Sequence, residues 1–159
     1  MTDISEKPGH LIRRCHQISS SLFFQECEGS DLTPIQYAIL SVLNERGELD
    51  QKTLAAAVSL DKSTAAETIR RLEKKGLIER RAGQTDRRAR IVSLTGEGSR
   101  IVVALRANVD NVHNRLLEAL DEHERPLFVY LLKKICSELE AESRPRVIAS
   151  SAQPASRAG

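Results

Sequence analysis

The hydrophobic period of the chain changes at Gly76, and this change limits the folds that the chain can adopt. Before Gly76, apolar residues recur at three- and four-residue spacing, which is typical of helices that bury one face. After it, Leu77–Arg81 and Arg90–Leu94 have the pattern of strands, joined by the turn-rich segment Ala82–Asp86. We therefore expect a mainly α fold with one small β-hairpin.

Start signals and apolar stripes predict six helices. Thr33, followed by Pro34 at the first helical position and Gln36 at the third, has the pattern of a capping box. Other starts are expected at Asp50, at Asp61 or Ser63, and at Thr95 or Gly96. The expected ranges are about 10–27, 34–46, 51–58, 62–75, 95–120 and 124–141.

The third and fourth of these helices form the most informative pair. Only Ser59 and Leu60 separate them, which leaves room for a tight turn and predicts a helix-turn-helix. Between Arg70 and Arg90, nine lysines and arginines stand against three acidic residues, although the whole chain is only +2. Such a local positive field attracts polyanions, and nucleic acid is the usual one. A solvated basic face is the alternative.

Several classes of protein are excluded by what the sequence lacks. No apolar run approaches the roughly 20 residues that cross a bilayer, and the N-terminus lacks a secretory pattern, so we expect a cytoplasmic protein. No Gly-rich phosphate loop, GxSxG elbow or HExxH motif is present, so we expect no enzyme and no cofactor. The three cysteines have no zinc-site spacing, and no metal site is expected from the histidines. These residues are Cys15, Cys27, Cys136, His10, His16, His113 and His123.

Three sequence blocks resemble the MarR family of bacterial transcription regulators over about residues 10–141. The first is Leu-Thr-Pro-Ile-Gln-Tyr at 32–37, and the second is Leu-Glu-Lys-Lys-Gly-Leu-Ile-Glu-Arg at 72–80. The third is Asp-Arg-Arg at 86–88, followed by Leu-Thr-Gly-Glu-Gly at 94–98. Their order and spacing are more specific than a helix-turn-helix alone.

The resemblance implies a winged helix-turn-helix with long N- and C-terminal dimerisation helices. We expect one MarR-like domain over 10–141, between a flexible N-terminus at 1–9 and a disordered tail at 142–159. Within it, 10–27 and 95–141 would form the dimerisation helices, and 33–94 the DNA-binding lobe. Two such lobes in a homodimer would reach successive major grooves of a pseudo-palindromic operator in double-stranded DNA.

The helix 62–75 is the expected recognition helix, because a major groove about 12 Å wide admits one α-helix. Glu67 is a departure from the family pattern, since a carboxylate repels phosphate. It could accept a hydrogen bond from cytosine N4 or pair with Arg71. The residues expected on the outer, DNA-contacting side are Lys62, Ser63, Thr64, Glu67, Thr68 and Arg71.

The hairpin tip is the second expected contact with DNA. Arg87 and Arg88 would enter a narrow, electronegative minor groove, where a guanidinium is favoured. The family resemblance implies that Asp86 orients Arg88. The alternative for Asp86 is that it only makes a turn.

The resemblance also implies control by a small molecule, because relatives often bind an aromatic acid between the dimer helices and the DNA-binding lobe. Arg14 and His16 would meet the carboxylate and Tyr37 would line the ring, with 6-hydroxynicotinate as the leading ligand. His16 could instead be a hydrogen-bonded histidine of the core or of the subunit interface. We expect a repressor that this ligand releases; the alternative is a redox sensor based on Cys15.

Overall fold

The computed structural model describes residues 3–83 and 89–140 of the 159-residue chain. These residues form helices α1 to α6, a short 3-10 helix and a three-stranded antiparallel sheet. The elements are η1 Ile4–Glu6, α1 Pro8–Glu26, α2 Pro34–Arg46, β1 Leu49–Asp50, α3 Gln51–Ala57, α4 Lys62–Lys74, β2 Ile78–Ala82, β3 Arg90–Leu94, α5 Gly96–Glu118 and α6 Glu124–Leu139. This arrangement confirms the mainly α fold with a small hairpin.

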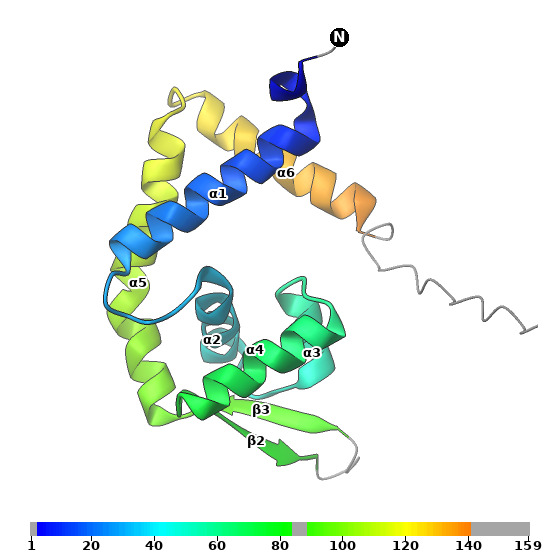
Figure 1. Ribbon diagram of the computed structural model, residues 1–159, viewed down its shortest axis with the longest axis vertical. Helices are drawn as coiled ribbons and strands as arrows, with labels where there is room; N and C mark the ends of the chain where they lie inside the picture. The colour runs from blue at the N-terminus through cyan, green and yellow to red at the C-terminus, as the bar shows by residue number, and fades with distance from the viewer. Residues whose placement is uncertain (1–2, 84–88, 141–159) are drawn as a thin grey trace, which may run out of the picture. The chain divides into compact units, whose positions relative to one another are not determined.

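The chain divides into two units, Met1–Leu120 and Asp121–Gly159. In the first unit, α2 and α3 contact β3, α4 contacts β2, and α5 extends from the sheet to lie against α1 (Figure 1). In the second unit, α6 is the described helix, and none of its residues is buried. Within the described residues, no helix is long and apolar enough to cross a membrane.

The main core lies inside the helix-turn-helix and the sheet. Ile39 of α2, Leu54 of α3, Ile69 of α4 and Val92 of β3 have exposed fractions of 0%. Ile39, Leu54 and Ile69 belong to apolar stripes that the sequence predicts, and full burial of such a side chain stabilises the fold by about 1.5–3 kcal/mol. The core therefore fixes the position of α4 relative to the hairpin.

A smaller core cluster joins α1 to α2 and α5. It consists of Phe23, Cys27, Tyr37 and Val112, and the rings of Phe23 and Tyr37 lie with centroids 6.1 Å apart. Cys27 is buried, and this burial raises the pKa of its thiol. Cys27 is therefore a packing residue.

The helix starts agree with the predicted caps. Thr33 and Gln36 form the capping box at α2, and the Asp50 carboxylate accepts from the Lys52 and Thr53 backbone amides at α3. At α4, the choice between two candidates is settled by Asp61, which accepts from the first-turn amides. The turn between α3 and α4 includes Ser59 with φ of +54°, a left-handed conformation that lets two helices follow each other closely.

The sheet has one strand that sequence analysis missed. Its order is β1-β3-β2, with Leu49 opposite Val92 and Ile78 opposite Leu94. Strand β1 has two residues, too few to show an alternating pattern. Strand β2 begins at Ile78, one residue later than predicted, although the Thr95 amide still donates to the Leu77 carbonyl one step beyond the last paired residues.

Several boundaries differ by one or two residues from the expected ranges. Helix α1 begins at Pro8, two residues early, because proline suits the first helical position. Helix η1 lies within the segment 1–9 that we expected to be flexible. The expected tail, 142–159, lies outside the described residues.

A close contact joins the end of α4, the two long strands and the start of α5. The Thr95 hydroxyl donates to the Gly76 carbonyl at 2.7 Å and accepts from the Gly98 amide at 3.1 Å. A Cβ atom on Gly98 would lie 2.0 Å from the Leu77 carbonyl oxygen. Only glycine therefore fits at position 98 without moving α5 away from the sheet.

We expect Gly98→Ala to lower the free energy of unfolding by about 1–3 kcal/mol, the usual cost of overpacking. The neighbouring Gly96→Ala is the control, because a Cβ there would meet nothing within 4 Å. Urea unfolding of both variants measures the difference. Equal stability of the two variants would show that α5 can shift without cost.

Candidate nucleic-acid interface

The first turn of α4 is organised around the Asp61 carboxylate. Its Oδ1 accepts from the Ser63 and Thr64 amides, both at 2.9 Å. The Ser63 and Thr64 hydroxyls also donate to Asp61, each at 2.6 Å. These bonds hold the pKa of the Asp61 carboxyl far below its ordinary range. The residues Lys62, Ser63 and Thr64 are all exposed, so this turn presents polar side chains in fixed positions.

The middle of α4 carries one carboxylate between two arginines. Glu67 Oε1 accepts from Arg71 Nε at 2.9 Å, and Glu67 Oε2 pairs with the guanidinium of Arg70. Of the two roles considered for Glu67, the ion pair with Arg71 is present in the free protein. Arg70 was not among the expected contact residues, although it lies on the same exposed surface.

Thr68 does not lie on the outer face where the sequence analysis placed it. Its residue is 8% exposed, and its hydroxyl donates to the Thr64 carbonyl at 2.8 Å. Three-residue spacing from Ala65 and four-residue spacing to Leu72 place Thr68 on the buried side of the helix. The prediction that the Thr68 side chain lies on the outer side of the helix was therefore wrong.

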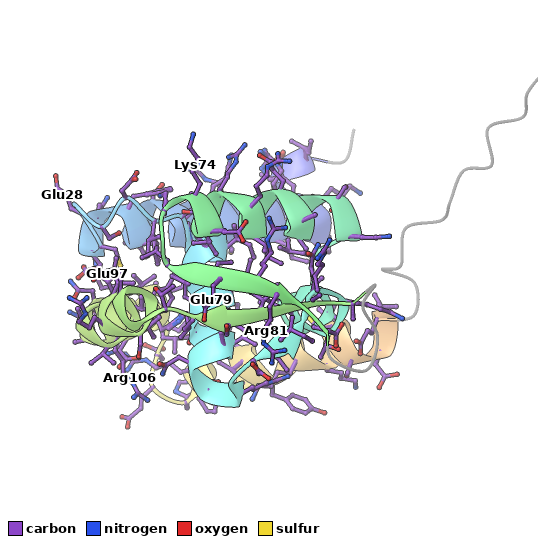
Figure 2. The ribbon with its side chains drawn as sticks, turned by 90° about the horizontal axis from the view of Figure 1, so that it is seen from below. Glu28, Lys74, Glu79, Arg81, Glu97 and Arg106 are labelled. Carbon is purple, nitrogen blue, oxygen red and sulfur yellow. The ribbon has the colours of Figure 1, made fainter. Side chains whose placement is uncertain are left out.

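Ion pairs connect the last turns of α4 to neighbouring elements. Arg80 of β2 donates through Nε to Glu73 at 2.9 Å, and this bond lowers the pKa of the Glu73 carboxyl. Lys75 pairs with Asp31 of the α1–α2 linker at 3.0 Å. Lys74 is exposed and points outward from the helix (Figure 2). Many of the basic residues near α4 are thus partly neutralised within the protein.

The hairpin is paired up to its tip. Ala82 lies opposite Arg90, and the Gly83 amide donates to the Ala89 carbonyl at 2.9 Å. The expected contact residues Arg87 and Arg88, and the expected orienting residue Asp86, lie outside the described residues.

A cleft of about 850 Å³ lies between α3, the start of α4 and the start of β3. Lys52, Lys62 and Arg90 contribute cationic side chains to its wall. Of these three, sequence analysis expected only Lys62 to contact DNA, although it counted Arg90 in the basic segment. Lys52 follows the Asp50 cap by two residues. This position in the first turn of a helix is the sequence feature that could have identified it as a site residue.

The expected ligand residues are not brought together within one chain. Arg14 and His16 are exposed on α1, whereas Tyr37 is buried against Phe23. His16 precedes Phe23 by seven residues, which is about 10 Å along a helix. Neither the cleft described above nor a cleft of about 690 Å³ near the end of α4 is lined by these three residues.

Tyr37 has charged neighbours that sequence analysis did not find. Burial is the main cause that raises the pKa of its hydroxyl, and Asp110 acts in the same direction. Arg106, which is exposed on α5, acts in the opposite direction. Asp110 and Arg106 are therefore charged residues of α5 whose electrostatic fields act on the Tyr37 hydroxyl.

A group of possible metal ligands lies at the start of α6. Asp121, His123 and Glu124 are exposed, and their ligand atoms lie within 4.8 Å of one another. Glu124 accepts from the Asp121 amide at 2.9 Å, which is an arrangement that stabilises a helix start. This helix-start role accounts for the grouping.

Comparison with known proteins agrees with the geometry. The MarR family model matches residues 32–89. The HTH-type transcriptional repressor NicR of Pseudomonas putida is 30% identical over 133 residues, which cover 84% of each chain. BpsR of Bordetella bronchiseptica, whose DNA binding is regulated by 6-hydroxynicotinic acid, has a TM-score of 0.80 at 30% identity, covering 85% of this chain and 96% of that one. PcaV of Streptomyces coelicolor, solved with its natural ligand, has a TM-score of 0.79 at 31% identity, covering 86% and 96%.

These likenesses confirm the winged helix-turn-helix that the sequence predicted. They give no support to the redox alternative for Cys15, which is exposed on α1. They also place the chain among proteins whose names describe regulation of transcription.

The Glu73–Arg80 pair leads to a prediction about pH. We expect Glu73→Gln to lower the free energy of unfolding by about 0.2–1 kcal/mol at neutral pH, the range for partly exposed ion pairs. Because the folded pKa of Glu73 is lowered, this contribution is present above pH 4.5 and disappears as the pH falls through the folded pKa.

Urea unfolding between pH 3 and 7 is the measurement. Glu79→Gln is the control, since it removes a carboxylate from β2 that makes no ion pair with α4 among the described residues. A deficit in Glu73→Gln that stayed constant down to pH 3 would contradict the assignment.

Proposed function

The chain belongs to the MarR family of transcription regulators, and from this premise we propose that it is a ligand-responsive repressor acting as a homodimer. Members of this family bind DNA and are not enzymes. The proposed dimer binds a pseudo-palindromic operator, and a small aromatic carboxylate such as 6-hydroxynicotinate releases it. The observation that carries the proposal is the exposed, polar and basic outer side of α4, held next to a β-hairpin.

The outer side of α4 supports recognition in the major groove. Lys62, Ser63 and Thr64 lie at its N-terminus, where the helix dipole favours phosphate oxygens. Arg71 lies further along the exposed side and can donate to base edges. The nearby cleft, with Lys52 and Arg90, suits the phosphates that flank the groove.

The proposal assigns the minor groove to the hairpin tip. The Asp-Arg-Arg block at 86–88 supports this assignment, with Arg87 and Arg88 as the contact residues and Asp86 orienting Arg88. Strands β2 and β3, which lead to this tip, pair in regular antiparallel register. A guanidinium is favoured in a narrow, electronegative groove.

Exposed apolar side chains support the homodimer. On α1, Leu11, Ile12 and Ile18 are 42–50% exposed. On α6, the exposed apolar residues are Leu127, Tyr130, Leu131, Leu132, Ile135 and Leu139. A monomer rarely leaves this many large apolar residues in water on two helices. A second copy of the chain would cover them and set two recognition helices about one DNA turn apart.

We expect Arg88→Ala to weaken operator binding by about 1–3 kcal/mol without changing the melting temperature. Affinity of the wild type should also fall steeply as salt rises, because bound lysines and arginines release counterions from DNA. The measurement is a gel shift with the upstream region of the protein's own gene, with the mass of the complex giving the number of chains. Unchanged affinity of Arg88→Ala at moderate salt would remove this arginine from the interface.

The effector proposal combines exposed residues of α1 with Tyr37 of the smaller core cluster. A carboxylate would meet Arg14 or His16, and Tyr37 would line the ring, with Arg106 as a further cation. Because these side chains are not brought together within one chain, we propose that the site is completed in the dimer. The likeness to BpsR, regulated by 6-hydroxynicotinic acid, supports the chemical class.

Release of DNA follows from linkage. An effector can weaken DNA binding only by binding the DNA-free conformation more tightly, and a tenfold preference corresponds to about 1.4 kcal/mol. A ligand held between α1 and the lobe that carries Tyr37 could supply this preference by changing the separation of the two recognition helices.

We expect 6-hydroxynicotinate to bind the wild type, and Arg14→Ala or His16→Ala to weaken binding by about tenfold, the equivalent of one lost charge-assisted hydrogen bond. Arg13→Ala is the matched control, because Arg13 is an exposed arginine next to Arg14 on the same helix. Calorimetry with 6-hydroxynicotinate, salicylate and hydroxycinnamate makes the measurement. Equal affinities of all four proteins, or no binding at all, would reject the site.

A further inference from the structure

The outer side of α4 carries a carboxylate, Glu67, that forms ion pairs with two arginines of the same helix. Glu67 uses one carboxylate oxygen for Arg71 and the other for Arg70, so both arginines are held by a single acid. The two arginine side chains are 67% and 66% exposed, and that of Glu67 is 40% exposed. The cluster therefore lies at the surface where the proposed function puts the DNA.

This cluster is poorly suited to binding phosphate alone. Its net charge is lower than that of two free arginines, and the Glu67 carboxylate repels a phosphate that approaches either of them. Arg71 contacts Glu67 through Nε, which leaves its two terminal amino groups without a partner among the described residues. A planar guanidinium that is held through Nε can donate through these two groups to a second acceptor.

The same cluster matches the major-groove edge of a G·C base pair. Guanine presents two acceptors, O6 and N7, which suit the terminal amino groups of Arg71. Cytosine presents an N4 amino donor, which suits a Glu67 oxygen. An A·T pair also presents two acceptors and one amino donor, but the adenine amino group lies between adenine N7 and thymine O4. The two acceptors are then not adjacent, so one guanidinium cannot bond both of them while a neighbouring carboxylate accepts from the amino group beyond them.

We propose that Glu67 is a specificity-determining residue of α4, which withholds Arg70 and Arg71 from non-specific phosphate contacts and directs Arg71 to a G·C pair. The proposal rests on DNA recognition by α4 as described above. Glu67 acts mainly through the two arginines, so it raises the preference for the operator over other DNA instead of raising affinity for all DNA.

The test begins with the full-length wild-type protein and a pool of random DNA duplexes. The selected duplex and a scrambled duplex of the same length are then titrated at several salt concentrations. We expect Glu67→Gln to bind the scrambled duplex more tightly than wild type does. The salt slope should steepen by up to about 2 units, since each added phosphate contact contributes about 0.9. The preference for the selected duplex should fall by about tenfold, the equivalent of one lost base contact.

Glu97→Gln is the matched control. Glu97 pairs with Arg100 at 2.6 Å in the same i, i+3 arrangement, but on α5. This variant removes the same charge and releases one arginine outside α4, so its preference for the selected duplex should equal that of wild type. The double variant Glu67→Gln with Arg70→Gln restores the net charge of α4, and its salt slope should return towards the wild-type value.

The outcomes separate this inference from the proposed function. If wild type selects no duplex, the proposed function and this inference both fail. If wild type selects a duplex but Glu67→Gln keeps the wild-type preference and salt slope, only the inference fails. The same holds if Glu67→Gln behaves as Glu97→Gln does. Loss of G·C pairs from the duplexes that Glu67→Gln selects would support the proposed base contact. Melting temperatures confirm that each variant is folded.

Discussion

The contact between Thr95, Gly76 and Gly98 determines where α4 lies relative to the rest of the first unit. One hydroxyl bonds the end of α4 and the start of α5, and the missing side chain at Gly98 allows α5 to approach the Leu77 carbonyl. Because α5 also packs against α1, one continuous helix connects α1 with the hairpin and the end of α4. The buried core below α4 then fixes its rotation.

On the outer side of α4, which we propose faces DNA, acidic residues of the same surface reduce the positive charge. Asp61 organises the first turn of α4, Glu67 the middle, and Glu73 the connection to β2. The basic residues on this surface are therefore held in defined directions in the free protein, which would lower the entropy lost in the proposed binding of DNA. The same pairs reduce the general attraction for polyanions, so the positive charge counted along the sequence overstates the charge available to phosphate.

The sequence predicted the order of helices, their caps and the hairpin, because these features depend on local signals. The signals are the spacing of apolar residues, the Asp and Thr residues that cap helices, and the Gly residues that end them. It could not reveal β1, whose two residues are defined only by pairing with Val92 and Ile91. Thr68 was misplaced because threonine suits either face, and only packing around Ala65 and Leu72 assigns it inward. Arg106 near Tyr37 and Lys52 near Arg90 were missed because these neighbours come from elements far apart in sequence.

The exposed state of α6 has a consequence for the biology of the proposed repressor. A 16-residue helix with no buried side chain gains little from its own chain, and isolated helices of this length are only marginally stable in water. In the proposed dimer, order in α6 would depend on meeting a second copy, and so on how many chains a cell holds. The amount of protein that a cell makes would thus help to set the fraction of chains that dimerise and can bind DNA. Gene dosage would in this way affect how strongly the proposed repressor acts.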